Sequence, residues 1–203
     1  MCNFEAQNYH HLKAILAQSS TLLTRNDRQP TASIWVGHGN NGGDGWLIAY
    51  YLQQAGWRVE VITVGIDSLG SNGQDKDLAD ALRAQKIAIG NNVAFQRFED
   101  IFNDKAKINT QADVYIDALF GIGLDRAPAG IYKQAIEDFN KAIDSHASHG
   151  KALVIAVDIP SCLVASTGQV FARLAIKADM TLCLIARKFG LHTKDGSDYA
   201  GMV

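Results

Sequence analysis

Short apolar segments alternate with helical patterns along this chain, and that alternation constrains its fold more than any other feature. Segments of strand length and apolar character lie at residues 32–37, 58–65, 113–121, 151–160 and 177–186. Segments with helical patterns lie at residues 10–23, 44–56, 72–85 and 129–146. The alternation predicts an α/β fold in which helices cover a mostly parallel sheet.

Other elements are less sharply marked. Residues 86–90 have the pattern of a short strand, whereas residues 91–110 have no clear pattern. In the helix expected over residues 44–56, Asp44 is placed to cap the N-terminus and Gly56 to end the helix. The continuous apolar character of residues 151–160 is typical of a strand buried on both faces.

Composition narrows the function classes. The 203 residues fit one domain, and a net charge of −2 gives no overall attraction to nucleic acid or to an anionic membrane. The cysteines, Cys2, Cys162 and Cys183, have no metal-site spacing, which favours a reducing compartment. No apolar run approaches the roughly 20 residues that span a bilayer, and no signal peptide is evident at the N-terminus, so we expect a cytoplasmic protein.

Four of the apolar strands end in polar loops of unusual composition. These loops have the sequences "HGNNGGDG", "GIGLDR", "IPSC" and "RKFGLHTKDG". In an open parallel sheet, ligands bind beyond the carboxyl ends of the strands. The four loops are therefore expected to share one edge of the sheet and to form the active site there.

The first of these loops has the G-x-G-x-x-G spacing of a dinucleotide-binding turn, at Gly37, Gly39 and Gly42. It follows an apolar strand and precedes a helix, where backbone N–H groups can bind a phosphate. A tight turn with Asp44 as a cap is the simpler alternative. A standard dehydrogenase fits poorly, because Glu60 falls inside the second strand and Asp67 beyond it. No G-K-[ST] follows the loop, so a P-loop fits worse.

Asp117 and Asp158 come at or near the ends of apolar strands, where a carboxylate is costly unless it is paired or bound. Together, Asn41, Asp117 and Ser161 would offer hard oxygen ligands with one negative charge, which suits a monovalent cation better than Mg²⁺ or Ca²⁺. His38 and His192 also fall in the loops. Without a visible partner, each is expected at the surface rather than as a base.

Four stretches together resemble the NAD(P)H-hydrate epimerase family, the YjeF N-terminal-like domain. They are "VGHGNNGGDG", "YIDALFGIGLDR", "VDIPSCLVASTGQV" and "KADMTLCLIARKFGLHTKDGSDYAG", and they cover most of the chain from Ile34 onward. The first 30 residues resemble the family only weakly. The resemblance implies a Rossmann-like three-layer α/β/α sandwich, usually homodimeric, that interconverts the R and S forms of hydrated NADH and NADPH. It also implies a companion ADP- or ATP-dependent dehydratase, fused or separate, so residues 1–203 would be one epimerase domain, either separate or cut from such a fusion.

The resemblance also implies roles for individual residues. Asp158 would be catalytic and contact the reacting ring, and one K⁺ per subunit would be bound by Asn41, Asp117 and Ser161. The remaining substrate contacts would come from two loops, namely Asn40, Asn41, Gly42, Gly43 and Asp44, and Gly121, Ile122, Gly123, Leu124, Asp125, Arg126 and Ala127. Loss of the hydroxyl leaves a cationic ring, and Asp158 would protonate the departing hydroxyl and later deprotonate the incoming water.

This chain departs from the family where Cys162 replaces a usual glycine and Val164 and Ser166 replace two aspartates. If that glycine needs a positive φ, the change is costly and displaces the loop. An alternative is therefore an impaired family member that acts as a nucleotide-binding or protein- or RNA-interaction module. A second alternative is an NAD-dependent oxidoreductase, which cofactor reduction would distinguish. No arginine is clearly placed for a 2′-phosphate, so NADHX and NADPHX both stay open as substrates.

Overall fold

The computed structural model describes residues 28–65, 76–103, 111–146 and 152–203. The helix predicted over residues 10–23 lies outside them. Six strands form one sheet in the order β3-β2-β1-β4-β5-β6, and every neighbouring pair is parallel. The strands are β1 (Thr31–Val36), β2 (Arg58–Thr63), β3 (Ala94–Arg97), β4 (Val114–Ala118), β5 (Leu153–Val157) and β6 (Met180–Leu182). The predicted α/β class with a parallel sheet is confirmed.

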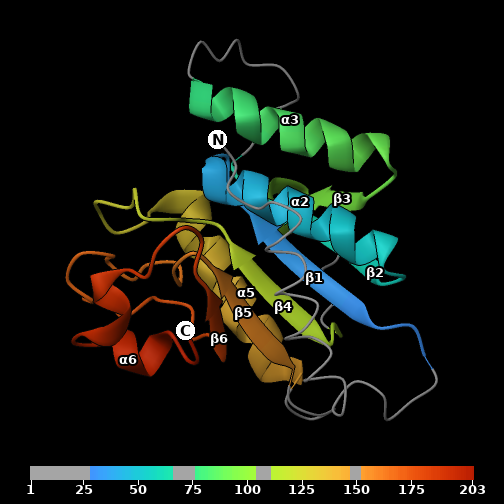
Figure 1. Cartoon of the computed structure of the whole chain (residues 1–203). Helices are drawn as coiled ribbons and strands as arrows, with labels where there is room; N and C mark the ends of the chain where they lie inside the picture. The colour runs from blue at the N-terminus through green and yellow to red at the C-terminus, as the bar shows by residue number, and fades with distance from the viewer. Residues whose placement is uncertain (1–27, 66–75, 104–110, 147–151) are drawn as a thin grey trace.

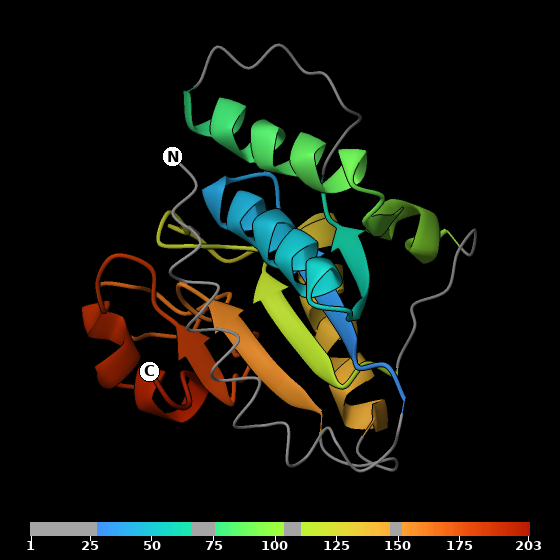
Figure 2. The ribbon, with the colours of Figure 1, turned by 45° about the vertical axis from the view of Figure 1, so that its right-hand side comes forward.

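Helices cover both faces of this sheet (Figures 1 and 2). Helices α2 (Asn40–Gln54) and α3 (Lys76–Gly90) lie on one face, and α5 (Gly130–His146) lies on the other. Three short helices complete the described chain, namely α4 (Phe98–Phe102), η2 (Phe189–His192) and α6 (Gly196–Tyr199). The arrangement is the three-layer α/β/α sandwich that the family resemblance implied.

Each face of the sheet has its own apolar core, because successive side chains of a strand point to opposite faces. In β1, Ile34 packs into the cluster under α2 and α3, whereas Trp35 packs into the cluster under α5. Trp35 lies edge-on to Phe139 of α5, with ring centroids 5.4 Å apart. Burial on both faces explains why these strands are continuously apolar rather than alternating.

The strand predicted over residues 86–90 is wrong, since α3 continues through Gly90 and the edge strand β3 begins at Ala94. The alternating isoleucines of this stretch resemble a strand, but Ala84 and Ala88 are buried four residues apart, which is the helical repeat. Ile87 is correspondingly 39% exposed. The edge strand lies in the region where the sequence showed no clear pattern.

Helix α2 begins at Asn40, four residues before the predicted start. Asp44 therefore lies inside the helix and is not its cap. The N-cap position is occupied by Gly39, which has no side chain that could cap the helix. Local propensity misleads here because Asn and Gly are poor helix formers, whereas contact with the preceding turn favours the helix. At the other end, Gly56 has φ +87 and follows the last helical residues, as predicted.

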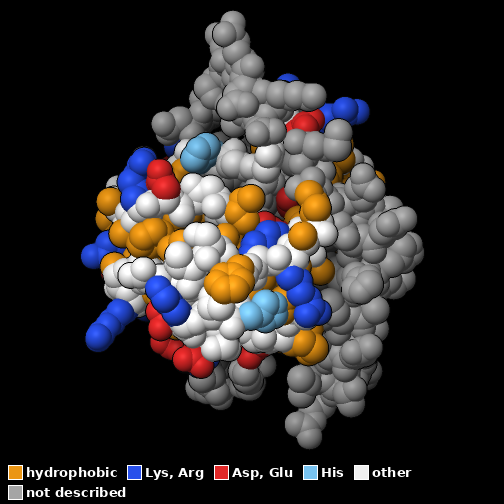
Figure 3. Space-filling view, turned by 60° about the vertical axis from the view of Figure 1, so that its left-hand side comes forward, with side chains coloured by type: hydrophobic (Ala, Val, Ile, Leu, Met, Phe, Trp, Pro, Cys, Tyr) orange, Lys and Arg blue, Asp and Glu red, His pale blue; other side chains and the backbone are white. Residues whose placement is uncertain are grey.

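Among the described residues, none of the helices combines the length and the apolar character needed to cross a bilayer. The face shown in Figure 3 carries basic and acidic side chains interspersed with apolar ones, so charge of one sign is not gathered in a single patch there.

Candidate functional site

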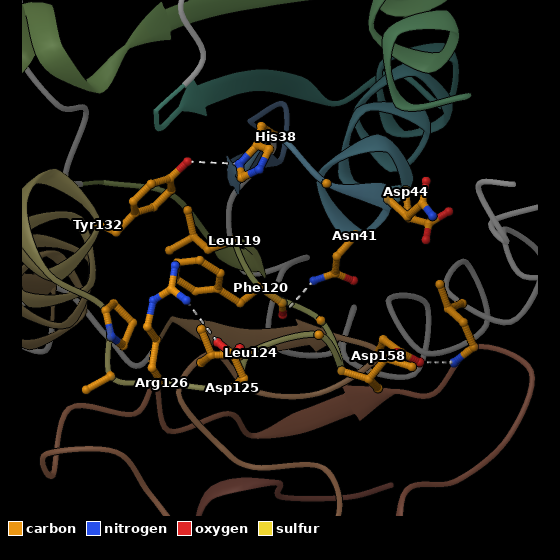
Figure 4. A pocket seen from close by; sticks show the side chains of 18 of the residues that line it. His38, Asn41, Asp44, Leu119, Phe120, Leu124, Asp125, Arg126, Tyr132 and Asp158 are labelled. Carbon is orange, nitrogen blue, oxygen red and sulfur yellow. Dashed lines mark hydrogen bonds and ion pairs between the residues drawn. The ribbon is translucent and has the colours of Figure 1, made fainter. Parts of the chain in front are cut away.

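A cavity of about 900 Å³ lies at the carboxyl ends of the strands (Figure 4). Its wall is formed by the loop after β1 and the start of α2, by the segment after β4, and by Tyr132 of α5. Asp158, which follows β5, and Leu184, which follows β6, also line it. Two of the four predicted loops thus line the cavity, whereas the loops after β5 and β6 are represented only by Asp158 and Leu184, which precede the quoted loop stretches.

The glycine-rich turn brings the start of α2 to this cavity by close backbone packing. A Cβ atom on Gly37 would lie 2.2 Å from the carbonyl oxygen of Leu119, and one on Gly42 would lie 1.8 Å from that of Gly37. Side chains at these two positions are thus excluded by backbone atoms. A Cβ on Gly39 would meet nothing within 4 Å, because this glycine faces open space.

Asn41 and Ser161 bind the backbone of Phe120, and Ser161 links it to Asp117. Asn41 Nδ2 donates to the Phe120 carbonyl at 2.9 Å, and the Phe120 N–H donates to Ser161 Oγ at 3.1 Å. Ser161 Oγ in turn donates to Asp117 Oδ1 at 2.6 Å, and its N–H donates to Asp117 Oδ2 at 2.7 Å. The three residues predicted as cation ligands therefore form one connected network.

Asp117 is completely buried, and desolvation raises the pKa of its carboxyl to about 6 despite the hydrogen bonds from Ser161 and Leu119. Asn41 Oδ1 is buried and accepts no hydrogen bond from the described residues. A buried acceptor without a donor is costly, and a buried carboxylate favours a compensating cation. An oxygen set with one carboxylate, one amide and one hydroxyl fits a monovalent cation such as K⁺.

Asp158 lies at the end of the cavity near β6, in the left-handed backbone region with φ +68. Its Oδ1 accepts hydrogen bonds from the Leu184 N–H at 3.1 Å and from Lys188 Nζ. Lys188 also donates to the Leu184 carbonyl at 2.9 Å, and the side chains of Lys188 and Asp158 are only 14% and 15% exposed. The carboxylate is thus held in a strained backbone position beside a largely buried ammonium group.

The segment from Gly121 to Ala127 forms the opposite wall of the cavity. Gly121 lies against Asn41, where a Cβ would be 3.4 Å from the Asn41 Cβ. Further along, Asp125 and Arg126 are paired at 3.5 Å and both are largely exposed, and Ile122 is 63% exposed. The wall therefore changes from a backbone packed on α2 to side chains open to solvent.

Not every predicted substrate contact borders the cavity. Asn40, Asn41 and Asp44 line it, as do Asp158 and all of Gly121 to Ala127, whereas Gly42 and Gly43 are buried behind its surface. Asp117 and Ser161 are fully buried and are not among the lining residues. The lining residues can contact a ligand in the cavity, whereas the buried residues can support the ones that do.

Cys162 has φ +74, the conformation that favours glycine, and its side chain is fully buried. Burial and the nearby Asp117 raise the pKa of its thiol to about 12, so it is not a nucleophile at neutral pH. The expected strain is therefore present. The neighbouring Ser161 makes two hydrogen bonds to Asp117 in this loop.

Two functional candidates were missed from the sequence. Lys188 was not singled out from the sequence, although a basic residue in a loop of the shared edge could have indicated it. His38 is exposed, as predicted, but its partner was not foreseen, since its Nδ1 lies 3.0 Å from the hydroxyl of Tyr132 on α5. Neither partnership follows from local spacing.

This chain matches one protein family and several relatives that share a name. Residues 6–190 match the family described as YjeF-related protein N-terminus, so the match begins well before Ile34. A Limosilactobacillus fermentum protein named NAD(P)H-hydrate epimerase is 35% identical over 191 residues, covering 94% of this chain and 81% of that protein. A Limosilactobacillus reuteri protein of the same name is also 35% identical, covering 83% of this chain and 68% of its own length.

Longer and more distant proteins match as well. The Escherichia coli bifunctional NAD(P)H-hydrate repair enzyme Nnr is 33% identical over 177 residues, which are 86% of this chain but only 30% of Nnr. The crystal structure of yeast YNL200c superposes with a TM-score of 0.63 over 89% of this chain and 70% of the yeast chain. At 16% identity, that likeness shows the fold alone.

Proposed function

This chain belongs to the YjeF-related protein N-terminus family, and from that premise we propose that it is an NAD(P)H-hydrate epimerase. The reaction interconverts the R and S forms of hydrated NADH and NADPH. The observation that supports it best is the arrangement of Asp158 at a cavity that is also lined by Asn41, with the buried Ser161 and Asp117 of the same network behind its surface. Relatives of this chain that carry the epimerase name cover most of its length.

The hydrated dinucleotide binds in the cavity, with its phosphates at the N-terminus of α2. Backbone N–H groups there have no intrahelical partners, and the helix dipole favours an anion. Asn40, Asn41 and Asp44 would contact the substrate from this side, and Gly121 to Ala127 from the opposite wall. The buried Gly42 and Gly43 would contribute through the backbone.

Asp158 contacts the reacting ring. The positive charge of Lys188 compensates the negative charge of the Asp158 carboxylate. Asp158 transfers a proton to the departing hydroxyl, which leaves as water, and Lys188 Nζ supplies that proton through its hydrogen bond to Oδ1. The pair then carries one negative charge, which stabilises the cationic ring. Water adds to the opposite face, its proton returns to the pair, and the configuration of the carbon is inverted.

A K⁺ ion would be held by Asn41, Asp117 and Ser161. The buried Oδ1 of Asn41, which lacks a donor among the described residues, supports this assignment. When bound, the ion would compensate the Asp117 carboxylate and stabilise the loop that carries Ser161. That loop continues directly from Asp158, so the ion would also help to fix the position of the catalytic carboxylate.

Proton NMR of purified hydrates tests the function directly. A sample enriched in the R form of NADHX should return to the R/S equilibrium much faster with the protein than without it. The absorbance of the sample should show no net oxidation or reduction, which separates epimerisation from the action of an oxidoreductase. A protein that is folded but does not change the rate with either NADHX or NADPHX would contradict the proposal.

An impaired family member that serves as a binding module is the second candidate. The strained Cys162 favours it, because this position departs from the glycine usual in the family. The intact contacts of Ser161 with Asp117 favour the enzyme. A hydrate that binds in equilibrium dialysis but shows no epimerisation would support the binding module.

The organisation of the protein in the cell is a further part of the proposal. Residues 1–203 would act as one epimerase domain, as a homodimer, in the cytoplasm. An ADP- or ATP-dependent dehydratase, fused or separate, would consume the S form. Sedimentation equilibrium of the protein tests the dimer.

A further inference from the structure

His38 and Tyr132 form a hydrogen-bonded pair at the end of the cavity away from Asp158 (Figure 4). We propose that His38, held by Tyr132, contacts the adenosine diphosphate half of the dinucleotide and helps to determine which nucleotides bind. The proposal rests on the proposed function for the identity of the substrate. It does not depend on the epimerase chemistry.

The topology of the sheet divides the cavity into two halves. The strand order reverses between β1 and β4, and in such sheets a dinucleotide lies across the reversal with one nucleotide on each side. Asp158 follows β5 and belongs to the β4-β5-β6 side, where the reacting ring is placed. His38 follows β1, so the other nucleotide would lie toward the β1-β2-β3 side and meet it.

Tyr132 is fixed on the β2 side by its surroundings. The phenol lies against the backbone of Gly65, just beyond the end of β2, where a Cβ would be 2.1 Å from the Tyr132 hydroxyl oxygen. The Tyr132 ring also packs on Phe120 with centroids 5.2 Å apart. The phenol thus reaches from α5 over the sheet edge to His38, which lies just before α2, and it restrains the imidazole.

The imidazole has a ring nitrogen left for a ligand. Its Nδ1 is engaged by Tyr132, and Nε2 has no hydrogen-bond partner among the described residues. When the phenol donates to Nδ1, the imidazole carries its proton on Nε2 and presents a donor beside the first turn of α2. A phosphate oxygen at that helix terminus is a matching acceptor.

The charged side chains of the cavity provide few donors for an anionic ligand. Among the described lining residues, Asp44, Asp125 and Asp158 are acidic, and Arg126 is the one with a permanent positive charge. Arg126 is 86% exposed and already paired with Asp125. An anionic ADP group therefore needs neutral donors close to the helix, and His38 is placed to supply one.

Equilibrium binding of the two halves of the substrate tests the contact. ADP and nicotinamide mononucleotide would be titrated calorimetrically into the wild type, His38→Ala and Tyr132→Phe. We expect His38→Ala to weaken ADP binding about tenfold and Tyr132→Phe to weaken it several-fold, with binding of nicotinamide mononucleotide unchanged. His192→Ala is the matched control, since this exposed histidine does not line the cavity.

Kinetics separates a binding role from a structural one. Loss of a contact to the nonreacting half should raise KM for epimerisation about tenfold in His38→Ala and leave kcat unchanged. Unchanged ADP affinity in both variants, equal weakening of both probes, or no ADP binding by the wild type would overturn the proposal. If ADP binding depends on His38 but no epimerisation occurs, the proposed function fails and the contact stands.

Discussion

Lys188 is ion-paired with Asp158 across the loops that follow β6 and β5, although 30 residues separate them in the chain. The ammonium group is also anchored on the carbonyl of Leu184, a residue that lines the cavity. The lysine therefore does not move freely at the surface but holds the carboxylate at one end of the cavity. A pair of this kind can pass a proton without leaving an uncompensated charge in a partly buried site.

Replacing Asp158 with Asn should lower kcat for epimerisation at least about 100-fold, because the amide cannot transfer a proton. The loss is measured by NMR of the R and S hydrates. Asp198→Asn, at an exposed position of α6, is the matched control and should behave as the wild type. Undiminished turnover by Asp158→Asn would remove this carboxylate from the mechanism.

Replacing Lys188 with Met should reduce kcat more than it changes KM, since the lysine acts through Asp158 rather than on the substrate. Lys188→Arg keeps the charge and should recover part of the rate. Stopped-time NMR assays at several substrate concentrations give both constants. If Met and Arg variants are equally impaired, the charge of Lys188 is not what matters.

Because Asp117 is buried, we expect the stability of the protein to depend on pH, and this dependence to change with K⁺. Burial raises the pKa of its carboxyl to about 6, so between about pH 4 and pH 6 the folded protein binds more protons than the unfolded chain. Without K⁺, the contribution of this group to stability should be complete below about pH 4. It should fall by about 3 kcal/mol as the pH rises past 6.

Potassium should reverse this loss, because it binds the ionised carboxylate and competes with the proton. Urea unfolding in KCl and in tetramethylammonium chloride at equal ionic strength should therefore differ more at pH 7.5 than at pH 5. A K⁺ effect of the same size at both pH values would argue against Asp117 as a ligand.

Cys162 should show the cost of a side chain at positive φ. Cys162→Gly and Cys162→Ala both remove the buried thiol, but only glycine relieves the backbone conformation at φ +74. We expect the glycine variant to be more stable than the alanine variant by about 1 kcal/mol in urea unfolding. Alanine equal to or better than glycine would show that this position carries no strain.

Replacement by alanine should lower the stability of the protein much more at one glycine of the turn than at another. A Cβ on Gly42 would lie 1.8 Å from a backbone oxygen, so Gly42→Ala should destabilise the protein by about 3 kcal/mol or more. Gly39→Ala meets nothing within 4 Å, so only the weaker preference for alanine at this N-cap position counts against it, and the loss should be about 1 kcal/mol or less. Thermal unfolding of the two variants measures the contrast, and equal destabilisation would contradict the packing described for α2.

The sequence by itself determined the parallel α/β sheet and the edge at which its polar loops meet. Both follow from local patterns, since apolar runs of strand length, helical repeats and the loops after strands are properties of neighbouring residues. Asp117 and Asp158 could be chosen in the same way, because a carboxylate after an apolar strand is costly wherever the strand is buried. The set of cation ligands could be proposed from the same reasoning, whereas the resemblance to a family added K⁺ as the ion and the contacts of the substrate loops.

Local patterns were misleading where tertiary contacts compete with them. The start of α2 is stabilised by packing against Gly37, and α3 extends through residues 86–90 because Ala88 is buried. Only the tertiary structure decided that Lys188 pairs with Asp158 and that His38 pairs with Tyr132, 94 residues away. Such pairs depend on how helices and loops pack over the sheet, and the spacing of residues along the chain does not show which of them will meet.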